Sequence, residues 1–376
     1  GAARTDLGGA LVLPGLLDVH VHLDKCHTWE RAPNRRGEFW DALEALRADS
    51  VNWTPNDLYR RAGFGLRQAW SHGTVAMRTH IDSDKVCSDD AHAVLQQLKA
   101  EWQGRIELQT VSLCDLRAFS GPRADAVLEL SQRHHATALG GFPQPNAELP
   151  RQLDALLSAA RELGLGLDLH IDESGLADAE CLRATAEAVL RNEFPYPVVC
   201  GHCCSLARQS SERAKSTIDL VRAAGIAVVT LPLCNLYLQD RRWRQTPNWR
   251  GLTLVHELLD AGVTVASGSD NVRDAFYAWG DFDVLEVFQQ SVRIGHLDTR
   301  MHHAPALVTT APAAIMGLPD HGRVAPGARA DLVVCDAHTF NELLARPTQP
   351  RRLIHGETFR AREALPLARL QETSRV

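Results

Sequence analysis

The sequence lacks any apolar run near the roughly 18 uncharged residues that a membrane-spanning helix needs, and it does not open with the layout of a signal peptide. It also lacks an excess of positive charge, because 40 Lys and Arg stand against 46 Asp and Glu, for a formal net charge of −6. Nucleic acids and anionic membrane surfaces select basic proteins. We therefore expect neither nucleic acid nor a membrane as a partner.

The spacing of a disulfide framework is missing as well. The nine cysteines are an odd number, and they are scattered through predicted strands and helices. This distribution suits reduced, buried thiols better than the paired cysteines of a small secreted protein. We therefore expect a cytoplasmic protein.

Predicted strands and helices alternate along most of the 376 residues. Nearly all the strands are separated by a helix of about three turns. The eight predicted strands lie at 16–25, 74–80, 106–113, 138–141, 166–170, 198–202, 226–231 and 263–267. Repeated units with near-continuous apolar strands are typical of a parallel sheet, and eight of them close a barrel. We therefore predict an α/β fold, a TIM-type (β/α)8 barrel; a doubly wound open sheet is the alternative.

Beyond about Gly317 the sequence changes to short strands joined by turns, predicted at 322–324, 327–336 and 352–356. A β module this small is marginal alone, so its partner strands would most naturally come from a segment before Gly1. The predicted domains are 1–12, the start of the barrel or the end of a β-sandwich segment; 13–317, the barrel; and 318–376, the C-terminal part of a small β-sandwich formed by the chain termini.

Two segments before the second strand have clear signals. Thr54 is a helix N-cap followed by Pro55 and by Asp57, and Gly73 follows later, which predicts a helix from Pro55 to about Ser71. The long polar segment between the first predicted strand and this helix is predicted to be a loop with a short helix. A segment of this length between core elements is usually functional, so we predict a lid or a pocket wall.

His20 and His22 stand two residues apart in the first predicted strand. Side chains two apart in a strand project from the same face, whereas on a helix they would diverge by about 200°. The pair can therefore point at one metal ion. The alternative is a pair of hydrogen-bonded packing histidines.

Metal-capable residues also follow other predicted strands: His80 and Asp82, His170, His202, and Asp270. Active sites of α/β barrels lie at the C-terminal ends of the strands, so these side chains are expected to gather at one mouth. Three imidazoles and one carboxylate suit a catalytic metal site that keeps a position open for water, whose pKa the ion lowers. The predicted ligands of one divalent ion, zinc or iron, are His20, His22, His170 and Asp270.

Two further features lie near these strand ends. Cys200-Gly201-His202-Cys203-Cys204 superficially resembles a structural zinc cluster, but no second CxxC pair completes four ligands, so we interpret it as buried thiols around a catalytic His202. Glu173 stands three residues after His170 and can carry protons between water, substrate and leaving group without binding the metal. The alternative is an exposed loop residue.

These motifs resemble the cytosine deaminase branch of the amidohydrolase superfamily. The likeness runs in order from about residue 11 to 336. It is carried by the segments 14–24, 78–84, 142–144 and 170–173, by His202, by Ser269-Asp270-Asn271 and by the closing Ala330-Asp331-Leu332-Val333-Val334, which is typical of the superfamily's β-sandwich.

The resemblance implies one metal ion on the four ligands above, Glu173 as a proton shuttle, and His202 beside the bound hydroxide. Gln144 matches the position that hydrogen-bonds the lactam edge of a pyrimidine. Asn271 and Phe276 stand where the cytosine enzymes carry Asp and Trp, so the pocket is expected to accept a different ring. Lys25 resembles relatives that act on aminated triazines; as a cation near the metal it would steady an oxyanion.

We therefore predict a metal-dependent aminohydrolase that deaminates a cyclic amidine, such as cytosine or a related pyrimidine, and releases ammonia. One alternative is hydrolysis of an aminated or N-alkylamino triazine, a creatinine-like ring or a cyclic amide at the same site. An alternative of another class is a metal-binding protein without catalysis. The predicted partners are a small heterocyclic substrate and further copies of the chain in a homo-oligomer.

Overall fold

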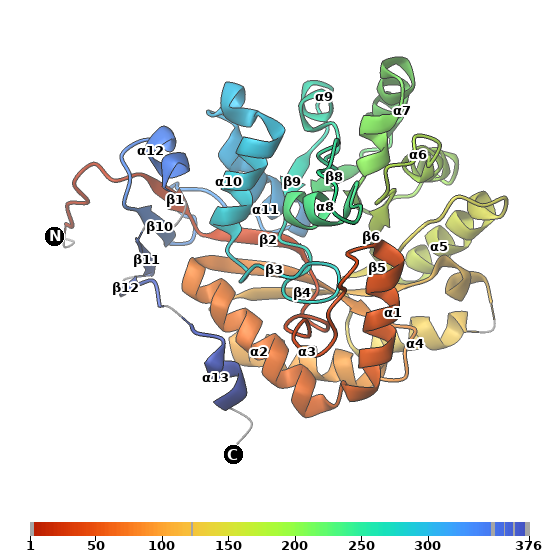
Figure 1. Ribbon diagram of the computed structural model, residues 1–376, viewed down its shortest axis with the longest axis horizontal. Coiled ribbons are helices and arrows are strands. Elements are labelled where there is room, and N and C mark those ends of the chain that lie inside the picture. Colours follow the sequence, from red (N-terminus) through yellow and green to blue (C-terminus); the bar gives the residue numbers. More distant parts are fainter. Residues whose placement is uncertain (1–3, 122, 347–349, 357, 364, 373–376) are drawn as a thin grey trace.

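The computed structural model describes residues 4–121, 123–346, 350–356, 358–363 and 365–372. Its centre is a parallel sheet of eight strands that follow one another in chain order (Figure 1). The strands are β2 (Leu16–Val21), β3 (Thr74–Asp82), β4 (Glu107–Cys114), β5 (Ala138–Gly141), β6 (Gly166–Ile171), β7 (Val198–His202), β8 (Ala227–Thr230) and β9 (Val265–Ser267). A parallel bridge between Val21 and Asp270 nearly closes the sheet, so the predicted (β/α)8 barrel is confirmed.

Helices surround the sheet on its outer side (Figure 1). They include α2 (Pro55–His72), α3 (Ser88–Trp102), α4 (Ala124–Arg133), α5 (Leu149–Leu163), α6 (Cys181–Arg191), α7 (Ser211–Ala223), α8 (Pro232–Leu238), α9 (Val255–Asp260), α10 (Val284–Gly295) and α11 (Thr310–Met316). On α5, Leu153, Leu156, Leu157 and Ala160 are buried at the spacing of one helix face. Burial of each leucine contributes about 1.5–3 kcal/mol. No helix in the described ranges is both long and apolar enough to cross a membrane.

Local signals set the ends of α2 as predicted. The side chain of Thr54 accepts a hydrogen bond of 3.3 Å from the backbone N–H of Asp57, and Pro55 occupies the first turn. Gly73 ends the helix with a φ of 95°, which glycine adopts without strain. The helix runs one residue further than expected, to His72.

Both ends of the chain build a separate antiparallel sheet, seen beside the barrel in Figure 1. Its order is β1 (Val12–Pro14), β10 (Asp331–Cys335), β11 (Arg351–His355) and β12 (Thr358–Ala361). The predicted strands at 327–336 and 352–356 are thus present, and β10 finds a partner strand within the chain. The prediction of a strand at 322–324 is wrong, because Gly322 has a φ of 68° and Val324 is 65 % exposed. The domain limits at 12 and 317 stay a prediction, and parts of both terminal ranges lie outside the described residues.

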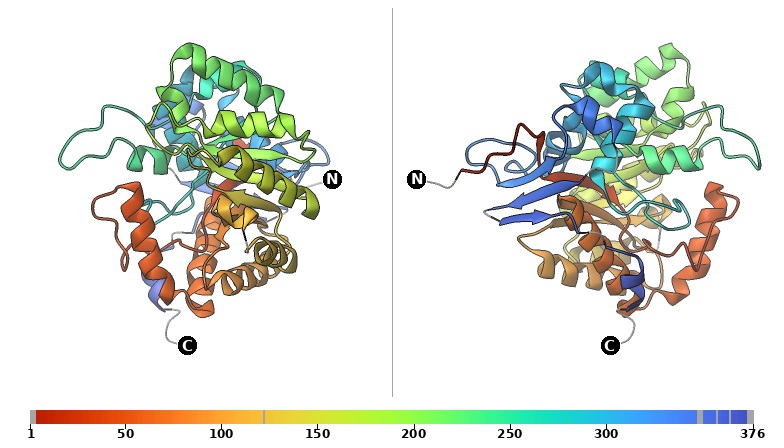
Figure 2. Two further views of the ribbon diagram at one scale, coloured as in Figure 1. Left: turned by 90° about the vertical axis from the view of Figure 1, so that its right-hand side faces the viewer. Right: turned by 60° about the vertical axis from the view of Figure 1, so that its left-hand side comes forward.

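The segment between β2 and α2 carries the helix α1 (Phe39–Asp49). Figure 2 shows α1 and the loop after α8 projecting on the same side of the barrel. The predicted short helix is therefore present, and it stands where it can flank the barrel mouth.

Candidate active site

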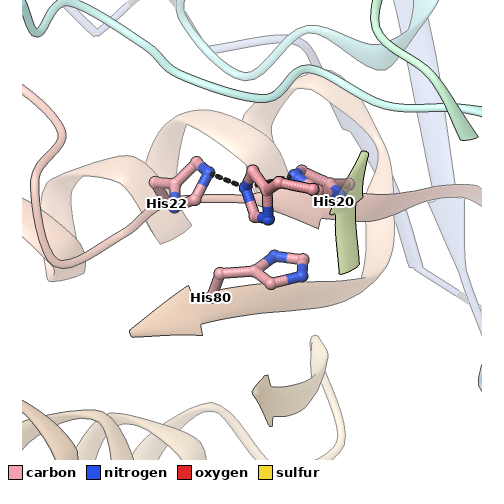
Figure 3. A group of neighbouring side chains, drawn as sticks. His20, His22 and His80 are labelled. Carbon is pink, nitrogen blue, oxygen red and sulfur yellow. Dashed lines mark hydrogen bonds between the residues drawn. The ribbon is translucent and has the colours of Figure 1, made fainter. Parts of the chain in front are cut away.

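Three imidazole nitrogens meet at the carboxyl ends of β2 and β6. Nε2 of His170 lies 3.1 Å from Nε2 of His20 and 3.1 Å from Nε2 of His22. Figure 3 shows His20 on β2 and His22 just past the end of that strand, with His80 on the strand beside it. Oδ1 of Asp270, next to the end of β9, lies 3.3 Å from Nε2 of His22 and 3.7 Å from Nε2 of His20. The four side chains predicted as ligands are thus brought together.

Their spacing and chemistry fit a divalent cation. Ligand atoms about 2.0–2.2 Å from a four-coordinate zinc ion lie about 3.3 Å from each other. Both carboxylate oxygens of Asp270 are buried, and in the described ranges the only side chain that interacts with them as a hydrogen-bond donor is the weakly donating thiol of Cys234. An ionised carboxylate in such a place is very unfavourable unless a cation offsets its charge. His20, His22, His170 and Asp270 would hold that cation.

The protonation states agree with this role. Burial lowers the pKa of His20, His22 and His170 well below the ordinary value, and the charges of neighbouring imidazoles and, for His22 and His170, the charge of Lys25 lower it further. The three rings are therefore neutral at physiological pH, which is the form that binds metal. Burial raises the pKa of Asp270, and a bound cation would counter that effect.

A second layer of residues lies behind His20. Oδ1 of Asp168 is 3.2 Å from Nε2 of His80 and 3.9 Å from Nδ1 of His20, while Oδ2 accepts a hydrogen bond of 3.0 Å from Arg78. The ring of His80 packs against that of His20, with centroids 4.1 Å apart. Such outer residues orient a metal-binding ring. His80, which the sequence marks as metal-capable, thus packs against His20, and its ligand atom also lies within 4.8 Å of those of His20, His22 and His170.

Two glycines make room for His20. A Cβ on Gly201 would lie 2.9 Å from Cε1 of His20, and a Cβ on Gly268 would lie 3.1 Å from its backbone oxygen. The Cys200–Cys204 motif therefore contains a position where any side chain would push the predicted ligand aside. The cysteines of the motif are free and buried, as are Cys26, Cys114, Cys181, Cys234 and Cys335; Cys87 is free and half-buried.

We expect Gly201→Ala to weaken zinc binding about 10–100-fold, the effect of losing outer support for a ligand, because the added methyl displaces the ring of His20. Competition with a chromogenic zinc chelator measures this. Gly63→Ala is the matched control, since its Cβ would meet the nearest atom at 3.5 Å. Equal zinc affinity in the two variants would contradict the placement of His20 in the site.

The predicted catalytic residues lie directly beside the cluster. His202 ends β7, and its Nδ1 is 3.4 Å from Oε1 of Glu173 and 4.0 Å from Oδ2 of Asp270. Its φ of 66° is a strained conformation of the kind that gathers at functional sites. Burial and the charge of Asp270 raise the pKa of Glu173 well above the ordinary value. This shift favours the protonated form of Glu173, which is the form that a general acid uses.

A cavity of about 380 Å³ opens over this group of residues. Its lining includes His22, His170, Glu173 and His202. Apolar walls come from Phe39, Trp40, Leu43, Phe142 and Phe276. The volume falls within the range of about 300–1,000 Å³ typical of small-molecule sites. Because α1 supplies part of the wall, the prediction of a pocket wall after the first strand is confirmed.

All four residues predicted to contact substrate line this cavity: Lys25, Gln144, Asn271 and Phe276. Lys25 is buried, and its Nζ lies 2.8 Å from Oδ1 of Asp82. Although burial alone lowers the pKa of Lys25, the charges of Asp82 and Asp24 outweigh it and raise that pKa. Asp82, a metal-capable residue by sequence, is thus the counter-ion of Lys25.

The loop that carries Asn271 and Phe276 is organised by a buried carboxylate. Nδ2 of Asn271 donates to Oδ2 of Asp274 at 2.7 Å, and Oδ1 of Asp274 accepts from the backbone N–H of Phe276 at 2.9 Å. The ring of Phe276 meets that of Phe39 edge to face, with centroids 5.5 Å apart. Asn271 and Phe276, the two residues that differ in type from those of the cytosine enzymes, are therefore fixed in place.

Sequence reasoning missed Asn235 on α8 and the cations at the mouth of the cavity. Nδ2 of Asn235 is 2.9 Å from Nδ1 of His202. Among the cavity-lining cations, Arg117 pairs with Asp115, whereas Arg47 and Arg123 have no ion-pair partner in the described part of the chain. No sequence motif marked Asn235, which lies directly after Cys234 in the segment that follows β8.

The (β/α)8 barrel carries a cluster of His and Asp side chains at its mouth with Glu173 beside it, an arrangement that fits a metal-dependent hydrolase. The chain belongs to the amidohydrolase family, whose sequence model matches residues 65–358. This confirms the resemblance to a deaminase branch of that superfamily.

Individual relatives are deaminases and related aminohydrolases. The chain is 47% identical over 350 residues to a pterin deaminase from Rhizobium rhizogenes, covering 93% of this chain and 80% of that one. A solved 5-methylcytosine deaminase from Klebsiella pneumoniae aligns with a TM-score of 0.83 and 24% identity over 97% and 91% of the two chains, which shows the shared fold. An N-isopropylammelide isopropylaminohydrolase from Burkholderia multivorans aligns with a TM-score of 0.78 and 26% identity over 96% and 88%.

Proposed function

We propose that this amidohydrolase deaminates a pterin, a fused two-ring heterocycle whose amino group sits on a carbon between two ring nitrogens. The observation that carries the proposal is the 47% identity to a pterin deaminase across 93% of the chain. A pterin contains the cyclic amidine that the sequence predicts as the reacting group. The proposal therefore keeps the predicted reaction and replaces cytosine with a larger ring.

The cavity supports a flat, extended substrate. Phe39, Phe142 and Phe276 provide aromatic walls, and aromatic side chains favour offset or edge contacts with planar rings. Arg47 and Arg123 add positive charge to the mouth. We propose that these cations favour a pterin with a carboxylate substituent, because an unpaired guanidinium binds a carboxylate through two hydrogen bonds.

The roles we propose for the site follow from its geometry. When bound, a single divalent cation, zinc or iron, supplies a water-derived nucleophile by lowering the pKa of water. Asp270 accepts one proton of that water. Glu173 gives its own proton to the ring nitrogen beside the reacting carbon, takes up the proton of the new hydroxyl group as the carbonyl forms, and passes that proton to the departing amine. The proton held by Asp270 then returns to Glu173 and restores the starting state. His202 and Lys25 donate hydrogen bonds to the negative charge that develops on the substrate.

The test is an assay of amine release by the metal-loaded protein, which measures ammonia from pterin, a carboxylated pterin, cytosine, 5-methylcytosine and creatinine, and isopropylamine from N-isopropylammelide. We expect kcat/KM for the pterins to exceed that for cytosine by about 100-fold, or roughly 2.7 kcal/mol of transition-state stabilisation. The advantage of the carboxylated pterin should shrink at high salt, because screening weakens exposed charge pairs.

Other outcomes of this assay decide among the alternatives. Faster turnover of cytosine than of any pterin would contradict the proposal. Hydrolysis of a cyclic amide opens the ring without releasing ammonia, so product analysis separates that reaction. No turnover of any compound by metal-loaded protein would favour a metal-binding protein without catalysis. We also propose that the protein is cytoplasmic, because its nine free thiols fit a reducing compartment. We further propose that it forms a homo-oligomer, which light scattering would test.

A further inference from the structure

Asn235 lies between the two residues that handle protons. It sits in α8, directly after β8, and its side chain is fully buried. Its amide Nδ2 is 2.9 Å from Nδ1 of His202 and 3.4 Å from Oε1 of Glu173. The two hydrogens of one amide nitrogen thus serve an imidazole and a carboxyl group.

The amide is placed with Nδ2 toward both groups, so that each faces an amide hydrogen, while the buried Oδ1 of Asn235 accepts no hydrogen bond in the described ranges. With the amide turned the other way, Nδ1 of His202 would carry the proton and donate it to the amide oxygen, so the tautomer of His202 distinguishes the two orientations. Helix α8 is itself fixed relative to Glu173, because Nε2 of Gln239 donates to the backbone oxygen of Glu173 at 3.2 Å. The backbone N–H of Gln239 in turn donates to the backbone oxygen of Asn235 at 2.9 Å.

We propose that Asn235 is a positioning residue that holds His202 in the tautomer with its proton on Nε2. An amide NH₂ only donates, so Nδ1 of His202 is the acceptor, and a neutral ring then carries its proton on Nε2. That Nε2 is buried, and nothing in the described ranges hydrogen-bonds to it. His202 lines the substrate cavity, and in this tautomer its Nε2–H would be free to donate to the reacting molecule.

The same contact orients the acid. The second amide hydrogen points at Oε1 of Glu173, which leaves Oε2 of that carboxyl group to carry the proton toward the substrate. The side chain of Asn235 therefore orients both His202, the donor that stabilises developing charge, and Glu173, the donor that protonates the ring. The inference concerns deamination as such and does not depend on which ring is deaminated.

The direct test is nuclear magnetic resonance of zinc-loaded protein labelled with ¹⁵N-histidine, recorded without substrate. Long-range ¹H–¹⁵N spectra distinguish the two neutral tautomers, and the signals lost in His202→Gln identify the ring. We expect Nε2–H in the native protein and a switch to Nδ1–H in Asn235→Asp, because a carboxylate accepts from Nδ1. Nδ1–H in the native protein would overturn the proposal, whatever the substrate proves to be.

Kinetics provide the second arm. Asn235→Asp should lower kcat by about 10²–10⁴-fold with KM changed only a few-fold, an effect comparable to that of a wrong histidine tautomer in a serine protease triad. Asn235→Ala, which leaves both tautomers populated, should lose less. The matched control is Asn341→Asp on the exposed face of α12 (Phe340–Ala345), which should retain native kcat. Native kcat in Asn235→Asp, with its metal content unchanged, would overturn the proposal.

Discussion

Glu173→Gln is expected to lower kcat for ammonia release by about 10²–10⁴-fold, the usual contribution of a positioned acid or base. The amide keeps the size of the side chain and can still accept from Asn235, but it cannot give up a proton to the ring nitrogen or to the departing amine. Because Glu173 is not among the predicted ligands, the variant should bind as much metal as the native protein.

Three measurements make this result decisive: ammonia release, metal content by elemental analysis, and melting temperature. Glu162→Gln, an exposed position on α5, is the matched control and should keep native activity. Full activity in Glu173→Gln would remove this residue from the reaction. Loss of metal together with activity would reassign it as a ligand.

Removal of the divalent cation should reduce ammonia release to the level of the blank, and one equivalent of zinc or iron per chain should restore it. The apo protein should also melt at a lower temperature, because a ligand present at 1,000 times its Kd stabilises the native state by about 4 kcal/mol. Without the cation, Asp270 must be buried as an unpaired carboxylate or take up a proton.

His22→Ala should have the same effect without a chelator, since it removes one of three convergent imidazoles. His302→Ala, an exposed histidine, is the control and should bind and turn over normally. Turnover by the apo protein would contradict the metal-dependent reaction. Recovery only with two equivalents of metal would contradict a single-ion site.

The barrel could be predicted because its strands are apolar runs of short, regular length, each followed by a helix whose ends carry their own signals. The N-cap at Thr54 and the glycine at 73 determine α2 locally. The terminal sheet was harder, since β1 has three residues and too little pattern to mark a strand. The segment at 322–324 resembles a strand in composition, but Gly322 makes a tight turn against Thr309.

The residues of the candidate site likewise fall into those that the sequence could predict and those that it could not. Residues at strand ends, such as His20, His170 and Asp270, could be placed together because parallel strands in a barrel present their carboxyl ends at one mouth. Asn235, Arg47 and Arg123 come from helices or a helix start, and only the packing of those elements on the barrel decides what they face. The ion pair between Lys25 and Asp82 forms because two strand ends lie side by side. The sequence marked both residues as site candidates but did not predict that they pair.

The small terminal sheet and the histidine pair belong to one extended segment. Gly15 donates its N–H to Asp331 in the terminal sheet, and Leu16 donates its N–H to Gly73 in the barrel. Because only Gly15 separates β1 from β2, the pairing of Val12 with Val334 limits how far β2 can slide against β3. A slip of β2 by one residue would turn the side chains of both His20 and His22 away from the mouth, so the C-terminal strand β10 contributes to the orientation of the two imidazoles.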